Sequence, residues 1–103
     1  IKKGKKGGLQ YHRKKNECGY LLEGEMILRH VNQDGELVEK CLKPGDVFHF
    51  PPGVVHQEEA ISNCRIIEAS STHFNDRFRM EDYFCVDKVE GLPSTTNAEI
   101  QEM

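Results

Sequence analysis

The chain has 103 residues, of which 30% are charged, and its formal net charge is −3. A chain of this length forms one domain with one core, and its acidic balance argues against nucleic acid as a partner. No apolar run approaches the roughly 20 residues of a membrane span, and no signal peptide is visible. The chain begins with Ile1 rather than Met, so we expect that it was trimmed or cut from something longer.

Short strand-like stretches separated by turn signals follow one another along the chain. We expect strands at 8–12, 18–22, 25–31, 37–42, 47–50, 54–58 and 64–69. Asp34-Gly35 signals a hairpin, and Pro51-Pro52-Gly53 interrupts the strand ladder because proline has no N–H to donate. Many short strands with hardly any helical periodicity predict an all-β sandwich or barrel.

The sequence changes character after Ser71. The charged and aromatic run 76–83 fits either a short helical turn or an extended edge strand. The stretch after Gly91 has the composition of a linker. Asn97 is placed to cap a last short helix carrying Ile100 and Met103, the alternative being a disordered end. We therefore predict a barrel at residues 1–90 and a C-terminal tail at 91–103.

The four cysteines are widely spaced and form no Cys-x-x-Cys pair: Cys18, Cys41, Cys64 and Cys85. They lie in apolar stretches, which favours reduced thiols in the core over disulfides. Reduced thiols are typical of a cytoplasmic protein, and that is the location we expect.

The residues with the clearest chemistry are Gln10-x-His12, Glu17 and His56. Two imidazoles, a carboxylate and an amide oxygen suit Fe, Mn, Ni, Co or Zn. Gln10 and His12 are two residues apart, so on a strand they face the same side. His56 comes from a distant segment, which places the predicted metal site inside a β-barrel rather than on a helix.

These residues belong to two spaced motifs that resemble those of the cupin family. The first motif runs Gly4, Gln10-x-His12, Glu17 and Gly24, with Gln10 where the family has its first His. The second runs Gly45, Pro51-x-Gly53 and His56, with Ala60 in place of the family's Asn. The resemblance covers residues 4 to 60, and eight positions agree at fixed spacings.

The cupin resemblance implies a double-stranded β-helix, or jelly roll, with a short C-terminal extension. It implies one divalent transition metal held by Gln10, His12, Glu17 and His56, a small-molecule ligand, and a homodimer. Some members of the family keep the fold without a metal, so a purely binding barrel is the alternative.

A narrower resemblance is to the cupin domain of type II mannose-6-phosphate isomerases. It rests on the Gln10-x-His12…Glu17 segment and on the later run Asp76-x-x-Arg79-x-Glu81-Asp82-Tyr83, although the family's final Arg is missing. It implies proton transfer on a sugar phosphate beside a divalent metal. The alternative for the later run is a surface salt-bridge cluster that anchors the tail.

Three side chains are candidate bases for that proton transfer, namely Tyr20, His49 and His73. A phosphate would be held by basic residues, for which the candidates are Arg13, Lys14 and Arg79. His30 is predicted to lie on the surface of its strand, and His49 to face away from Phe48 and Phe50. A metal-dependent isomerase, a non-catalytic binding barrel, and a metal-dependent lyase or dioxygenase remain the competing functions.

Overall fold

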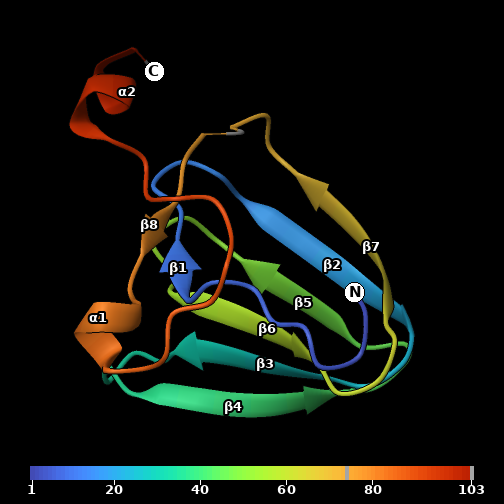
Figure 1. The fold of residues 1–103 in the computed structure, drawn as a ribbon. Helices are drawn as coiled ribbons and strands as arrows, with labels where there is room; N and C mark the ends of the chain where they lie inside the picture. The colour runs from blue at the N-terminus through green and yellow to red at the C-terminus, as the bar shows by residue number, and fades with distance from the viewer. Residues whose placement is uncertain (74, 103) are drawn as a thin grey trace.

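The computed structural model describes residues 1–73 and 75–102, which form two facing antiparallel β-sheets (Figure 1). The five-stranded sheet has the order β4 (Leu37–Leu42), β3 (Met26–Val31), β6 (His56–Ala60), β1 (Gln10–Tyr11) and β8 (Phe78–Arg79). The three-stranded sheet has the order β5 (Val47–Phe50), β2 (Glu17–Glu23) and β7 (Arg65–Ser70). This arrangement confirms the predicted all-β jelly roll.

The core fills the space between the two sheets because inward residues alternate along each strand. Its buried members are Leu21, Met26, Leu28, Leu42, Phe48, Phe50, Ala60 and Cys64. Gly19 on β2 makes room for the ring of Phe48, since a Cβ at Gly19 would lie 2.1 Å from the Phe48 Cζ. Each large side chain removed from water in this way stabilises the fold by roughly 1.5–3 kcal/mol.

The two predicted strands that carry Gln10 and His56 differ from the prediction, one being shorter and the other displaced. β1 contains only Gln10 and Tyr11, and β6 starts at His56 rather than two residues earlier. The loop before β6 is hydrogen-bonded to the segment after β1 instead, since Gly53 donates its N–H to the His12 carbonyl at 2.7 Å. Gly53 adopts a φ of +88°, a left-handed conformation that glycine takes without strain. This turn returns the chain so that β6 begins with His56 inside the barrel.

Both alternatives for the run 76–83 occur, one after the other. Phe78–Arg79 forms the edge strand β8, and Glu81–Phe84 forms the short helix α1. The last helix, α2, spans Asn97–Glu102, and Met103 lies outside the described residues. Thr96 caps it rather than Asn97, since its hydroxyl accepts the Glu99 N–H while the Glu99 carboxylate accepts the Thr96 N–H.

The stretch before α2 is packed against the barrel rather than extended as a linker. Thr95 is buried, and its N–H donates to the Arg77 carbonyl at 2.8 Å. The Ser94 hydroxyl accepts the Arg79 N–H at 2.9 Å. These bonds tie the tail to β8, so the tail covers this edge of the five-stranded sheet.

The cysteines are free throughout residues 1–73 and 75–102, but only Cys64 belongs to the core. Cys18, Cys41 and Cys85 are exposed. The prediction of core thiols was wrong for these three. Cys18 and Cys41 lie on strands, whose successive residues alternate between the two faces. Cys85 lies at the C-terminal end of α1. No helix in the described part of the chain is long and apolar enough to cross a membrane.

Candidate metal centre

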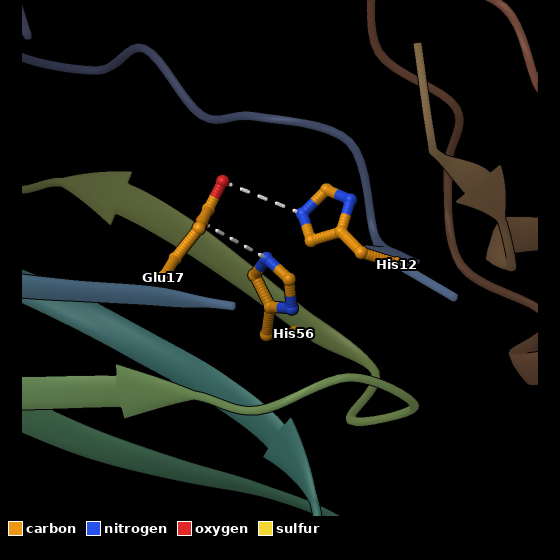
Figure 2. A group of neighbouring side chains, drawn as sticks. All are labelled: His12, Glu17 and His56. Atoms are coloured by element: carbon orange, nitrogen blue, oxygen red, sulfur yellow. Dashed lines mark ion pairs between the residues drawn. The ribbon is translucent and has the colours of Figure 1, made fainter. Parts of the chain in front are cut away.

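Three of the four predicted ligands come together at one end of the barrel, from three separate segments (Figure 2). His12 directly follows β1, Glu17 is the first residue of β2, and His56 is the first residue of β6. β1 and β6 are hydrogen-bonded neighbours, with Gln10 opposite His56. Strand pairing therefore carries residues from the beginning and the middle of the chain to one point.

The donor atoms of these residues face one another. His12 Nε2 lies 3.5 Å from one oxygen of Glu17, and His56 Nε2 lies 3.9 Å from the other. One ligand atom from each residue falls within 4.8 Å of the others. Ligand atoms about 2.0–2.2 Å from a common ion lie roughly 3–4 Å from each other. The spacing therefore fits a single transition-metal ion.

The far nitrogen of each imidazole is fixed by a backbone carbonyl. His12 Nδ1 lies 2.5 Å from the Asp76 carbonyl oxygen, and His56 Nδ1 lies 2.9 Å from that of Val54. A carbonyl oxygen only accepts hydrogen bonds, so each Nδ1 carries the proton and each Nε2 keeps a lone pair. This is the outer-shell arrangement that orients metal-binding histidines.

The His12 Nε2 atom is buried and has no hydrogen-bond partner among residues 1–73 and 75–102. Buried polar atoms are nearly always paired, and an unpartnered lone pair facing a carboxylate fits a metal-binding nitrogen. Burial also lowers the pKa of His56 to about 4, an effect that the nearby His12 reinforces. At neutral pH His56 is therefore neutral, the form that binds metals.

The turn that joins His12 to Glu17 is held by Asp76, a residue more than 60 positions away. Its carboxylate accepts the backbone N–H groups of Arg13, Lys14 and Lys15 at 3.0, 2.6 and 2.9 Å. Burial alone would raise the pKa of Asp76, but these three donors and the adjacent His12 hold it below its usual range. Asp76 thus fixes the turn by its carboxylate and His12 by its carbonyl.

A cation lies at the edge of the site. The Lys15 ammonium is 2.5 Å from Glu17 Oε1, and its side chain is 23% exposed. Lys15 offsets the charge of Glu17. It also places a positive group beside His12, Glu17 and His56, on the side that faces solvent. The sequence reasoning missed both Lys15 and Asp76 as parts of this site, although Asp76 lies in the charged run 76–83.

The fold is shared with known proteins. The family model described as "Cupin domain" matches residues 1–70, more than half of the chain. This chain is a cupin. A probable germin-like protein of Arabidopsis thaliana is 38% identical over 52 residues, which are 50% of this chain and 24% of that protein. An oxalate decarboxylase of Arthroderma benhamiae is 34% identical over 61 residues, 56% of this chain and 14% of that protein.

Solved structures agree on the fold. Oxalate decarboxylase from Bacillus subtilis superposes with a TM-score of 0.67 at 23% identity, covering 82% of this chain and 23% of that one. The capsular polysaccharide assembling protein CapF from Staphylococcus aureus gives a TM-score of 0.64 at 21% identity, covering 76% and 24%. The cupin described here spans no more than about a quarter of the length of these relatives.

The fourth predicted ligand, Gln10, has the right position on its strand. Residues directly opposite in an antiparallel pair project to the same face, so Gln10 shares the face of His56. It is half-buried. Its role as a ligand stays a prediction.

The cupin interior also holds a carboxyl group that the sequence reasoning did not single out. Glu58 follows His56 by two residues on β6 and pairs with the core residue Leu28, so it faces inward. Burial raises the pKa of Glu58 to about 8, helped by Glu68 and Glu17. Glu68 lies opposite Gly19 on β7, and partial desolvation raises its pKa although the residue is exposed. The alternation along β6 was the signal that could have identified Glu58.

Two of the predicted bases lie on the outer face of the three-stranded sheet. Tyr20 is opposite Val47 and His49 is opposite Cys18, and all four are exposed. His49 faces away from Phe48 and Phe50, as predicted, and contacts Asn16 Oδ1 at 2.6 Å. Glu17 points to the other face, toward Phe50. The structure therefore separates Tyr20 and His49 from the metal centre by the thickness of the sheet.

The third predicted base, His73, is half-buried in the loop after β7. Its Nδ1 contacts the Ser71 hydroxyl at 2.9 Å, and that hydroxyl accepts the N–H of Asn16 at 3.0 Å. His73 is thereby linked to the residue that precedes Glu17. The side chains of Arg13 and Lys14 are exposed on the turn beside the site.

Arg79 does not point a free guanidinium at the metal centre. It forms what we term the tail cluster, with Glu81 and the carbonyls of Val89 and Leu92. Its Nε donates to Glu81 at 3.0 Å, one Nη donates to Glu81 and to Val89, and the other Nη donates to Leu92 at 3.4 Å. Glu81 is 1% exposed, and its pKa is lowered chiefly by the hydrogen bond from Arg79. Asp82 is instead exposed and pairs with Lys88.

His30 was predicted on the surface, but it faces the interior. It continues the inward series of Met26 and Leu28 on β3 and lies opposite His56. The outward face of β3 carries Arg29, which is paired with Glu39 and Glu59. That outward ion-pair cluster fixes the orientation of the strand and turns His30 inward.

Proposed function

We propose that this cupin binds one divalent transition metal through His12, Glu17 and His56, with Gln10 as a fourth ligand, and acts on a small anionic metabolite. The observation that carries the proposal is the buried, unpartnered His12 Nε2 that faces the Glu17 carboxylate. Mn, Fe, Ni, Co and Zn all accept this donor set.

The chain's own residues define what the site offers to a ligand. A bound metal would supply Lewis-acid polarisation of a carbonyl or hydroxyl oxygen. His12 and His56 keep their lone pairs on the metal side because their Nδ1 atoms donate to carbonyls. Lys15 offers a cation to an anionic group beside Glu17. Of the predicted bases, His73 remains a candidate for moving a proton, since its loop is bonded to the Glu17 segment.

The substrate class that we put first is a sugar phosphate, with isomerase-like proton transfer. The exposed Arg13 and Lys14 beside the site support it, because both can reach a phosphate in solvent. Arg79 gives it no support, since Glu81 and tail carbonyls occupy its donors.

A small carboxylic acid such as oxalate is the second candidate, with lyase or oxygenase chemistry. Lys15 at the metal centre suits a compact anion, and two of the relatives are oxalate decarboxylases by name. A melting-temperature screen with mannose 6-phosphate and oxalate separates the two classes. Uptake of O2 or release of CO2 then separates an oxygenase or lyase from an isomerase. A non-catalytic binding barrel would show stabilisation by a ligand but no turnover.

Elemental analysis of purified protein tests the metal centre. We expect about one transition-metal ion per chain, lost on treatment with EDTA and regained on dialysis against the metal. His56→Ala should reduce the metal content at least tenfold, while His49→Ala, a histidine outside the barrel, should leave it unchanged. Equal loading of the two variants would contradict the proposed site.

The homodimer implied by the family resemblance is part of this proposal. Exposed apolar side chains gather on the outer face of the three-stranded sheet, among them Tyr20, Val47 and Ile67. Such a face is typical of an interface between copies. Light scattering of wild type and Val47→Lys should give a dimer and a monomer, and a monomeric wild type would contradict it.

A further inference from the structure

A cavity lies beside the candidate metal centre, at the open side of the barrel between the edge strands β4 and β5. Its volume is about 480 Å³, within the range of about 300–1,000 Å³ that small-molecule sites occupy. None of the three clustered metal-ligand candidates lines it. The ring of Phe50 forms the shared wall, since it lines the cavity and stacks on His56 with ring centroids 3.9 Å apart.

The floor of this groove is apolar and well packed. It consists of Leu28, Leu42, Phe48 and Phe50, each no more than 6% exposed. An apolar group placed on this floor would lose contact with water, which contributes roughly 25 cal/mol per Å² of apolar surface buried.

Of the polar residues that line the groove, Lys40 and His30 come from the inward face of two neighbouring strands. Lys40 pairs with Leu28, and His30 follows Leu28 by two residues, so both share the inward face of the five-stranded sheet. Diagonal neighbours of this kind lie about 7–8 Å apart, within reach of one ligand group.

The His30 Nδ1 and the Lys40 ammonium have no bonding partner among the residues that the structure describes. The His30 Nδ1 atom is buried and has no hydrogen-bond partner in the described part of the chain. Within residues 1–73 and 75–102, the Lys40 ammonium takes part in none of the ion pairs. An unpartnered buried ring nitrogen and an exposed, unpaired cation beside an apolar floor would match an apolar molecule that ends in an acid group, with the His30 proton on Nδ1.

We propose that this groove binds a small apolar carboxylic acid, with its hydrocarbon part on the Leu28–Phe48–Phe50 floor and its carboxylate between Lys40 and the His30 Nδ1–H. The site is distinct from the metal centre and does not depend on the proposed metal. Lys40 lies on the edge strand β4, where an inward lysine also discourages pairing with another sheet edge. If that were its only role, Lys40 would have no effect on ligand binding.

Phenylacetate is the probe, titrated into EDTA-treated and zinc-loaded protein and followed by NMR of the backbone amides and the Leu28 and Leu42 methyl groups. We expect saturable shifts at the groove with a Kd of roughly 0.1–1 mM, alike in both metal states. The neutral analogue phenylacetamide should bind at least about threefold more weakly, because it lacks the charge that Lys40 pairs with.

Variants identify the residues. Lys40→Gln should weaken phenylacetate binding about three- to tenfold and Lys40→Arg should restore it within about twofold. His30→Phe should also weaken it, because it keeps the apolar volume and removes the donor. Lys43→Gln, an exposed lysine near the end of the same strand, should change nothing.

Four results would overturn the proposal. They are the absence of saturable shifts at the groove up to roughly tens of millimolar probe, binding that requires zinc, equal binding of phenylacetamide, and equal effects of Lys40→Gln and Lys43→Gln. Because metal-free protein is tested in parallel, failure here is distinguishable from failure of the metal centre.

Discussion

The metal centre and the tail cluster are both groups of charged side chains withdrawn from water, yet their polar atoms are used differently. In the tail cluster the Arg79 guanidinium is bonded on all three nitrogens, to Glu81 and to backbone carbonyls. In the metal centre His12 Nε2 has no partner among the described residues, and the donor pairs stand 3.5 and 3.9 Å apart. Side chains whose polar atoms are all hydrogen-bonded stabilise the fold. Side chains whose unpartnered polar atoms converge on one point are arranged to bind a ligand there.

Removing one partner of the closed tail cluster should have the largest effect. Glu81→Ala leaves the Arg79 guanidinium, whose side chain is 16% exposed, without its carboxylate. Unfolding free energy should fall by about 3–5 kcal/mol, as for other buried pairs that lose one member. Metal affinity of the remaining folded protein should not change. Denaturant unfolding and calorimetric metal titration measure the two effects.

The neighbouring residue supplies the control for that experiment. Asp82→Ala removes an exposed carboxylate paired with Lys88 and should cost less than about 0.5 kcal/mol. A loss of metal affinity in Glu81→Ala would mean that the tail cluster serves the metal centre after all.

Asp76 holds the turn that carries His12, so its loss should lower both stability and metal affinity. Asp76→Asn replaces one acceptor oxygen by a donor, so it cannot accept all three N–H bonds of the turn. We expect a loss of about 2–3 kcal/mol in stability and about 10–100-fold in metal affinity, because the turn carries His12. Asp46→Asn, which changes an exposed turn acceptor, is the control and should leave metal affinity unaltered.

Glu58 allows the interior of the barrel to be tested by pH. Its folded pKa of about 8 lies above the unfolded value of 4.5, so its contribution is complete below pH 4.5 and is lost as pH rises toward 8. Glu58→Gln stays neutral at both pH values. In metal-free protein its unfolding free energy relative to wild type should therefore rise by roughly 4 kcal/mol between pH 5 and pH 8.5. Urea unfolding at both pH values measures this.

Glu59→Gln is the matched variant on the outward face of the same strand, where Glu59 pairs with Arg29. Its effect should be the same at both pH values. A Glu58→Gln effect that does not vary with pH would show that Glu58 is ionised in the folded barrel.

The smallest expected effect concerns the fourth ligand. Gln10→His places an imidazole opposite His56 and should tighten metal binding about tenfold, because imidazole is a stronger donor to these metals than an amide oxygen. Gln33→His adds a histidine to an exposed turn and should have no such effect. Unchanged affinity in Gln10→His would place Gln10 outside the ligand shell.

What the sequence predicted well was fixed by short-range spacing. Pro51-x-Gly53 dictates a turn two residues before His56, and the alternation of Phe48 and Phe50 put His49 on the outer face. His30 was misplaced because Ile27 blurs the alternation on β3, and only the ion pairs of Arg29 with β4 and β6 decide which face turns inward.

The remaining gaps come from contacts between distant residues. Asp76 binds a turn more than 60 residues earlier in the chain, and no local pattern reveals such a bond. The short tail motif Asp76-x-x-Arg79-x-Glu81 fitted two interpretations equally well, a substrate site and a structural cluster. Its role as a structural cluster emerged only when the partners of Arg79 were known.

The most direct test of the account is NMR of protein with ¹⁵N-labelled histidine, titrated with zinc. The five imidazoles report separately, so His30, His49 and His73 are internal controls. The account predicts that the Nε2 resonances of His12 and His56 alone shift from the lone-pair to the metal-bound range, with saturation at one zinc per chain. Zinc that leaves these two nitrogens unchanged, or that binds through His49 or His73, would contradict it.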